Sequence, residues 1–306
     1  MNFDSEHKIR LLAFEWLKEQ TVIHGEVLPE SVLEKGMPYG SERISFMADQ
    51  GIFKPRQLKY PLTFKTTVNS PYEDSKNAAG YILYKYKGDN PEHPHNSGLR
   101  ECMIRRLPLI YFYAVAPAKY QPVWPVYIER DEPATLTFYV SVDEPQIRLF
   151  AETDYEKVAE SGGEEIKRKY ITAQVCRRLH QQRFREVVIQ AYREQCAMCR
   201  LKHPKLLDAS HITPDGEADG AAIIPNGISL CKLHHVAFDK CFLGIRPDYT
   251  IEVRNEILSE SDGPMLLHGL QGIHNQKIVL PSSIINHPDQ QRLKLRYEKF
   301  KAFVMN

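Results

Sequence analysis

The first segment of the chain with a clear hydrophobic pattern lies at about residues 5–25. Its apolar residues recur close to the spacing of a helix face, at Ile9, Leu12, Phe14, Trp16 and Leu17. Apolar positions three and four apart are typical of an amphipathic helix. We therefore predict an opening helix over this segment.

From about residue 40 to residue 150 the pattern changes to short apolar and aromatic runs. The runs at 81–86, 109–115, 123–128 and 135–142 alternate with clusters of Gly, Pro, Asn and Asp. Short strands bounded by turn residues are typical of all-β barrels and sandwiches. We predict a barrel or sandwich in this region.

The remaining chain returns to helical spacing after a turn-like stretch at 160–164. A basic helix is expected at about 166–194, with an inner stripe of Val175, Leu179, Phe184, Val188 and Tyr192. A compact segment rich in Cys and His follows at about 195–256. The tail is expected to hold a strand at 277–280 and a closing helix near 290–303.

Composition and charge limit the protein class. A chain of 306 residues is about two domains at roughly 100–200 residues each. Its 42% hydrophobic residues are enough for a buried core and argue against general disorder. The polar N-terminus lacks the pattern of a signal peptide, and no apolar run is long enough to span a membrane. We expect a cytoplasmic protein with no membrane partner.

The net charge of +1 neither requires nor excludes a nucleic-acid partner, but the charge is unevenly distributed. Between residues 164 and 206 there are eleven basic and four acidic residues. An isolated charge run is usually a solvated helix face. Beside a metal-binding segment, a surface that contacts phosphates is an equally good interpretation.

Two short Cys and His pairs have the spacing of a metal site. Cys196 and Cys199 form a C-x-x-C pair, and Cys231 and His234 form a C-x-x-H pair, with 31 residues between them. Two such pairs supply four ligands to one tetrahedral Zn²⁺ and leave no open position, so this zinc is expected to be structural. A redox role for the C-x-x-C would need a thioredoxin-like context, which is absent.

Between and after these pairs, the order of residues resembles the HNH endonucleases, which have the ββα-metal fold. The matching residues are Ala209-Ser210-His211-Ile212, Asn226-Gly227 and Cys231 to Asp239 with His234-His235. The resemblance implies that His211 is the catalytic base and that Asn226 fixes the loop carrying it. It also implies that His235 binds a catalytic Mg²⁺ or Mn²⁺, with Asp239 as a second ligand.

One position departs from the family pattern. Many HNH enzymes have Asp or His directly before the base as a metal ligand, whereas this chain has Ser210. The nearest carboxylate is Asp208, which on a regular strand points to the face opposite His211. His235 with Asp239 is therefore the preferred ligand pair, and Asp208 is the weaker candidate. The C-x-x-H spacing favours His234 over His235 as the zinc ligand.

A second resemblance covers part of the predicted β region. Tyr72-Glu73-Asp74, Gly80 to Gly88 and Asn96 to Leu99 are similar to a run in SRA (YDG) domains, PUA-like barrels that flip a modified cytosine out of the duplex. The resemblance implies stacking by Tyr72 and Tyr84 and a hydrogen bond from the base to Asp74. Lys54 and Arg100 are candidate phosphate contacts. An ordinary half-exposed strand with alternating Tyr and Lys residues would explain this part of the sequence equally well.

The whole chain resembles modification-dependent restriction endonucleases of the SRA-HNH type. The expected fold class is α+β, with an SRA/PUA-like β-barrel and a zinc-braced ββα-metal HNH domain. The expected divisions are a DNA-recognition domain at 1–158, a basic helical linker at 159–194, the HNH domain at 195–256 and a C-terminal extension at 257–306. The expected partner is double-stranded DNA with methyl- or hydroxymethylcytosine. One HNH site cuts one strand, so a double-strand break requires a homodimer or two events.

Three alternatives stay open on the sequence alone. The reader could recognise another mark, such as a phosphorothioate, or no mark. The chain could be a zinc-stabilised DNA-binding protein without activity, in which case His211 is dispensable. It could also be a nuclease whose barrel senses a small ligand.

Overall fold

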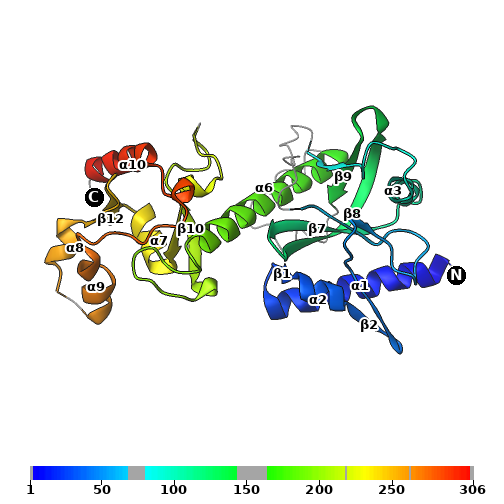
Figure 1. The fold of residues 1–306 in the computed structure, drawn as a ribbon, viewed down its shortest axis with the longest axis horizontal. Helices are drawn as coiled ribbons and strands as arrows, with labels where there is room; N and C mark the ends of the chain where they lie inside the picture. The colour runs from blue at the N-terminus through cyan, green and yellow to red at the C-terminus, as the bar shows by residue number, and fades with distance from the viewer. Residues whose placement is uncertain (1–2, 68–79, 143–163, 218, 262, 304–306) are drawn as a thin grey trace. The chain divides into compact units, whose positions relative to one another are not determined.

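The computed structural model describes residues 3–67, 80–142, 164–217, 219–261 and 263–303 (Figure 1). The chain divides into two compact units, Met1–Leu179 and His180–Asn306. Each unit is described by itself below. The four-part division expected from the sequence stays a prediction.

A mixed sheet forms the centre of the first unit. Its strands are β1 (Leu28–Pro29), β4 (Ile52–Phe53), β5 (Thr63–Lys65), β6 (Ile82–Lys85), β7 (Leu109–Ala116), β8 (Lys119–Glu132) and β9 (Thr137–Val142). Their order is β4-β5-β7-β8-β9-β6, with β1 also paired to β8. All pairs are antiparallel except β5 with β7. Within the described residues β4 and β6 are edge strands, so the expected SRA/PUA-like barrel is not confirmed.

Strand β7 explains why this sheet has a core on each side. All eight of its residues are buried, and successive side chains of a strand point to opposite faces. Tyr111 and Tyr113 pack into one cluster and Phe112 and Ala114 into the other. The continuous apolar run in the sequence is therefore a strand buried on both faces.

Helices cover both faces of the sheet. Helix α1 (Phe3–His24) contributes Ile9, Ala13 and Leu17 to one core. Helix α3 (Pro94–Ile104) and the first half of α6 (Glu164–Ala191) contribute to the other. The unit also contains α2 (Glu30–Lys35), the hairpin of β2 (Met37–Tyr39) and β3 (Glu42–Ile44), and the 3₁₀ turn η1 (Pro133–Thr135).

The second unit combines short strands with short helices. In order these are η3 (Pro204–Leu206), β10 (Leu207–His211), η4 (Ile224–Asn226), β11 (Gly227–Cys231), α7 (Lys232–Asp239), β12 (Leu243–Ile245), β13 (Ile251–Val253), α8 (Asn255–Ser259), α9 (Pro264–Gly269), η5 (Gln271–Ile273), η6 (Ile284–Asn286) and α10 (Gln290–Ala302). The pairs β10–β11 and β12–β13 are antiparallel. The end of α6 belongs to this unit, because Phe184 and Val188 lie in its core.

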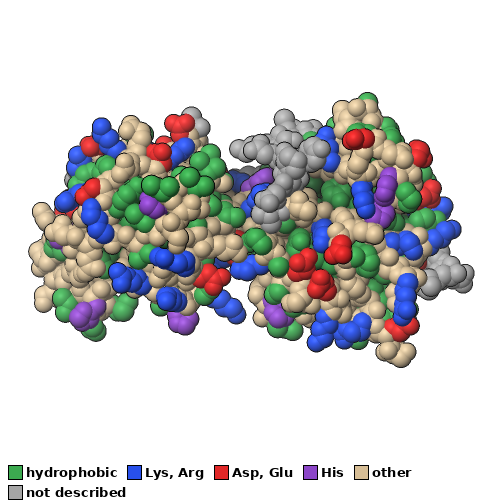
Figure 2. Space-filling model, in the orientation of Figure 1, with side chains coloured by type: hydrophobic (Ala, Val, Ile, Leu, Met, Phe, Trp, Pro, Cys, Tyr) green, Lys and Arg blue, Asp and Glu red, His purple; other side chains and the backbone are tan. Residues whose placement is uncertain are grey.

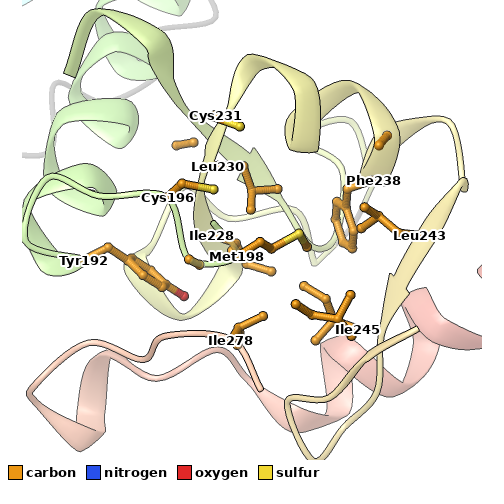
Figure 3. Close-up of a cluster of buried hydrophobic side chains, with 14 of the residues drawn as sticks. Tyr192, Cys196, Met198, Ile228, Leu230, Cys231, Phe238, Leu243, Ile245 and Ile278 are labelled. Atoms are coloured by element: carbon orange, nitrogen blue, oxygen red, sulfur yellow. The ribbon is translucent and has the colours of Figure 1, made fainter. Parts of the chain in front are cut away.

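The C-terminal residues are part of the core of the second unit. Figure 3 shows Ile278 in the same cluster as Ile228 and Phe238, and Leu293 of α10 is fully buried in it. The backbone N–H of Val279 also donates to the carbonyl of Ala197 at 2.7 Å. Residues after 257 are therefore needed to complete the hydrophobic core around β10 and β11.

Most elements expected from the sequence are confirmed, including the opening helix, the basic helix with its buried stripe and the closing helix. The strand expected at Lys277–Leu280 is wrong. Lys277 makes one isolated bridge with Thr250, and the next residues bond separately to Tyr249 and Ala197. Because its hydrogen bonds go to two different segments, no ladder forms.

The described helices include none that is both long and apolar enough to cross a membrane. The face of the molecule seen in Figure 2 has Lys and Arg side chains on both units, interspersed with acidic and apolar ones.

Candidate active site and metal centre

Two groups of polar side chains lie around one ββα element made of β10, β11 and α7. The strands pair without a register shift from Leu207 opposite Cys231 to His211 opposite Gly227. Helix α7 begins directly after β11, so its first turn stays beside the hairpin. His234 and His235 are consecutive on α7 and point to different groups, because successive side chains on a helix are about 100° apart.

The first group is a metal-type cluster of Cys196, Cys199, Cys231 and His234. Their ligand atoms all lie within 4.8 Å of one another. The Nδ1 atom of His234 is 3.1 Å from the Sγ of Cys231 and 3.4 Å from the Sγ of Cys196. Among the described residues, these four side chains are the group of His, Cys, Asp or Glu residues whose ligand atoms lie close enough together to hold a metal ion.

The ring of His234 is held for metal binding by its other nitrogen. Its Nε2–H donates to the carbonyl oxygen of Gly269 in α9 at 2.7 Å, which leaves Nδ1 facing the sulfurs. Metal-binding histidines usually have such a partner. Burial lowers the pKa of His234, but hydrogen bonds with Cys196 and Cys231 outweigh it and raise the pKa to about 10. Positive charge is thus stabilised at the centre of the cluster, and this donor set fits Zn²⁺.

The second group surrounds His235 with two carboxylates. Its Nδ1 lies 3.5 Å from Oδ2 of Asp208, and its Nε2 lies 3.2 Å from Oδ2 of Asp239. Hydrogen bonds to Asp208 and Asp239 raise the pKa of His235 to about 9. Burial raises the pKa of Asp208, but the hydrogen bonds from His235 and Lys232 prevail, and its pKa lies well below the usual value.

Ser210 faces the same group. Its Oγ donates to Oδ1 of Asp239 at 3.2 Å. The same carboxylate lies 3.7 Å from the Nη2 of Arg296 in α10. The serine at the position where many HNH enzymes have a ligand therefore contacts a carboxylate from α7. Asp208 and Ser210 are two residues apart and both reach α7, as the alternation along β10 requires.

His211 is the last residue of β10 and is half-buried. Its ring stacks on Phe184 of α6, with 4.0 Å between centroids and 18° between planes. Burial lowers the pKa of His211, while the charges of Asp215 and Asp239 act in the opposite direction. The imidazole is therefore neutral near pH 7, the form able to accept a proton.

Asn226 is fully buried and bonds to the loop after His211. Its Oδ1 accepts from the backbone N–H of Thr213 at 2.8 Å, and its Nδ2 donates to the carbonyls of Thr213 and Ala221 at 3.0 Å each. The backbone N–H of Ile212 also donates to the carbonyl of Asn226. These bonds tie both sides of the long loop to the end of the hairpin that carries His211.

Sequence reasoning did not identify four residues at these groups: Phe184, Arg185, Gly269 and Arg296. Arg185 donates to the carbonyls of Pro204 and Leu207, and its Nε lies 3.7 Å from Oδ1 of Asp208. In the sequence, Phe184 is one residue of the predicted apolar stripe, and Arg185 is one residue of the basic segment. Neither pattern distinguished them from their neighbours. Gly269 acts through a backbone carbonyl, for which the sequence contains no signal.

The residues expected to read DNA do not form a group in the described structure. Tyr72 and Asp74 lie outside the described residues. Tyr84 is buried, and its ring makes an edge-type contact with the ring of Phe64. Arg100 forms a 2.6 Å ion pair with Asp131, and Lys54 donates to the carbonyl of Leu58. Their expected roles stay predictions.

The comparisons with known proteins agree with the geometry of the second unit. Residues 196–246 match a family of HNH endonucleases. No curated protein matches the chain. Among solved structures, the chain is similar to a modification-dependent TagI restriction endonuclease at 15% identity and a TM-score of 0.29, over 78% of this chain and 81% of that one. The chain contains an HNH endonuclease domain and is a DNA endonuclease.

Proposed function

We propose that the chain hydrolyses phosphodiester bonds of double-stranded DNA with His211 as the general base and a divalent cation beside His235. The observation that supports this most strongly is the grouping of His211, His235 and Asp239 on one ββα element. His211 ends β10 opposite Gly227, the first residue of β11, and His235 and Asp239 lie on α7, which begins directly after β11. A base and a cation site side by side are what phosphodiester hydrolysis by water requires.

In the proposed reaction His211 takes a proton from water as the water oxygen attacks phosphorus. The bond from phosphorus to the leaving oxygen breaks, that oxygen takes a proton from solvent, and His211 afterwards returns its proton to solvent. A general base is most efficient when its pKa is near the working pH, so a neutral half-buried imidazole suits this role. Asn226 keeps the end of β10 in place through its three hydrogen bonds to Thr213 and Ala221.

The donor set around His235 fits a Mg²⁺ or Mn²⁺ ion on the side of Asp239. Nδ1 of His235 would keep its hydrogen bond to Asp208, and this leaves Nε2 and the Asp239 carboxylate as the ligands. A carboxylate behind a ligating histidine commonly fixes its orientation. When bound, such an ion supplies charge stabilisation for the phosphate and the leaving oxygen. Asp208 then acts as an orienting group rather than a ligand.

The zinc cluster has a structural role in this proposal. Four protein ligands leave no open coordination position. Cys196 and Cys199 precede β10, Cys231 ends β11 and His234 lies on α7, so one ion would join all parts of the ββα element. Zinc would therefore hold His235 in place relative to the hairpin.

We further propose that cutting depends on a modified cytosine. The support for this is the similarity of the segments around Tyr72, Gly80 to Gly88 and Asn96 to SRA domains. A restriction enzyme needs such a selection step, because the HNH element is too small to supply much sequence specificity. A double-strand break would then need two copies of the chain, each cutting one strand.

The test is a cleavage assay on three matched duplexes that carry cytosine, 5-methylcytosine or 5-hydroxymethylcytosine. It uses Mg²⁺ or Mn²⁺, with His211→Ala as the control. Cutting of the modified duplexes alone, lost in the variant, supports both parts of the proposal. Equal cutting of all three, still lost in the variant, keeps the nuclease and rejects the reader. A variant that cuts as well as the wild type rejects His211 as the base.

A further inference from the structure

The end of the β10–β11 hairpin has a side chain on one strand only. His211 stands directly opposite Gly227. In antiparallel pairs, directly opposite side chains are close neighbours and limit each other's motion. Gly227 supplies no such neighbour, so the imidazole face above it is open to a side chain from another element.

Helix α6 fills this place. Phe184 is almost fully buried and lies flat on the His211 ring, with centroids 4.0 Å apart. A Cβ atom at Gly227 would lie 2.8 Å from the Phe184 ring and 2.5 Å from the Val188 side chain. Any other residue at position 227 would therefore push α6 away from the hairpin. Gly227 allows the helix to approach closely enough for the two rings to stack.

In the described part of the chain, the hydrogen bond that usually orients a catalytic imidazole has no counterpart at Nε2 of His211. Nε2 of His211 is buried and has no hydrogen-bond partner among the described residues. In most sites with a histidine base, a carboxylate or carbonyl bonds the second ring nitrogen and fixes the ring. His235 has the Asp208 carboxylate for this purpose, whereas His211 has a flat aromatic ring.

We infer that Phe184 is the positioning residue for the base His211, and that Gly227 is present because it admits the Phe184 ring. This inference rests on the function proposed above. Stacking restricts rotation about the bond between Cβ and the imidazole, so the reactive nitrogen keeps its direction without a hydrogen bond at the other nitrogen. Phe184 itself contacts no reacting atom, and its effect is on the rate of the chemical step.

The kinetic test compares Phe184→Leu and Phe184→Met with Val188→Ala on a duplex that the wild type cuts. Leu and Met keep an apolar group in the core but lose the flat face. Val188 is the control because it lies on the same helix and in the same core as Phe184 and also packs close to Gly227. It does not stack on His211. We expect kcat of the Phe184 variants to fall about 10- to 100-fold, since small misplacements of a catalytic group have effects of this size. KM should stay within about twofold, and Val188→Ala should keep kcat within about twofold.

A spectroscopic measurement covers the case in which the variants fold poorly. In the wild-type protein, the ring current of Phe184 should move the carbon-bound ring protons of His211 upfield in the NMR spectrum. His211→Ala identifies these signals by their loss. The upfield shift should disappear in Phe184→Met and persist in Val188→Ala.

Two results would overturn the inference. One is a Phe184 variant that folds and cuts with the kcat of Val188→Ala. The other is a pair of His211 ring signals at unshifted positions in the wild type. If the wild type cuts no duplex, or if His211→Ala cuts normally, the proposed function itself fails. That result is distinct, because it is obtained without any change at Phe184.

Discussion

The Nε2–H of His234 donates a 2.7 Å hydrogen bond to the carbonyl oxygen of Gly269. This bond joins the metal cluster to α9, outside the segment where the Cys and His pairs lie. It fixes the tautomer in which Nδ1 faces the sulfurs of Cys231 and Cys196. The C-terminal part of the chain thus supports the metal centre through its backbone as well as through the hydrophobic core.

Removal of one zinc ligand should unfold the second unit. We expect Cys199→Ser to lose bound zinc and to lower the melting temperature strongly, because binding of structural zinc contributes about 10 kcal/mol or more to folding in small zinc domains. Metal analysis and thermal unfolding of the full chain measure both effects. Cys241→Ser is the matched control, since Cys241 lies in the same unit outside the cluster. Equal zinc content in both variants would contradict the assignment.

Asn226→Ala should destabilise the loop after His211. The substitution leaves the N–H and carbonyl of Thr213 and the carbonyl of Ala221 without their partner, at about 1–3 kcal/mol for each group that stays buried. Urea unfolding measures the loss, and the cleavage rate should fall with it. Ser229→Ala is the control, because the Ser229 hydroxyl is buried in the same hairpin without a partner among the described residues. A control that loses as much stability as Asn226→Ala would refute the argument.

Arg296 should affect the site through Asp239. Its Nη2 donates to the carbonyl of Phe238 at 3.2 Å and lies 3.7 Å from the Asp239 carboxylate. We expect Arg296→Ala to lower the cleavage rate roughly tenfold. This is less than the loss of about 100-fold that a small misplacement of a catalytic group can cause. Arg296→Lys should be intermediate, because lysine lacks the planar fork. Lys294→Ala removes a charge from an exposed position of the same helix and should leave the rate unchanged. If Lys294→Ala lowers the rate as much as Arg296→Ala, the effect is one of charge alone.

The pH dependence of cleavage should reflect the burial of His211. Burial lowers the pKa of this imidazole below 6.5, so its neutral, proton-accepting form persists to a lower pH than that of an exposed histidine. The rate should therefore fall only as the pH decreases through that lowered pKa. A profile of log kcat against pH at saturating DNA and fixed metal concentration measures this. An acid limb with its midpoint above 6.5 would show that His211 is not the group being titrated.

Local patterns allowed much of the fold to be predicted. Four stripe residues of α6, including Val175 and Val188, are buried as expected, because helical spacing places them on one face, and Tyr192 directly after the helix is buried too. The apolar run of β7 was identified as a strand for a similar reason. The grouping of Cys196, Cys199, Cys231 and His234 was predictable because pair spacing constrains metal ligands to a few arrangements.

Relationships between distant segments were not predictable from the sequence. The stack of Phe184 on His211 depends on how closely α6 approaches the hairpin, which Gly227 determines through space rather than through a pattern. The strand expected at Lys277–Leu280 was wrong, because an apolar run does not reveal that its hydrogen bonds go to two segments. The barrel expected from short strands is not confirmed, since strand content leaves closure undetermined.

The most direct test of the account is single-turnover cleavage by the wild type and by His211→Gly, in Mg²⁺ and with zinc bound. The account predicts that the variant is slower by a factor of about 100 or more, as expected for loss of a general base. Added imidazole should restore part of the rate, because it can accept the proton in place of the missing side chain. Cleavage by the folded variant at the wild-type rate without imidazole would contradict the assignment of His211 as the base.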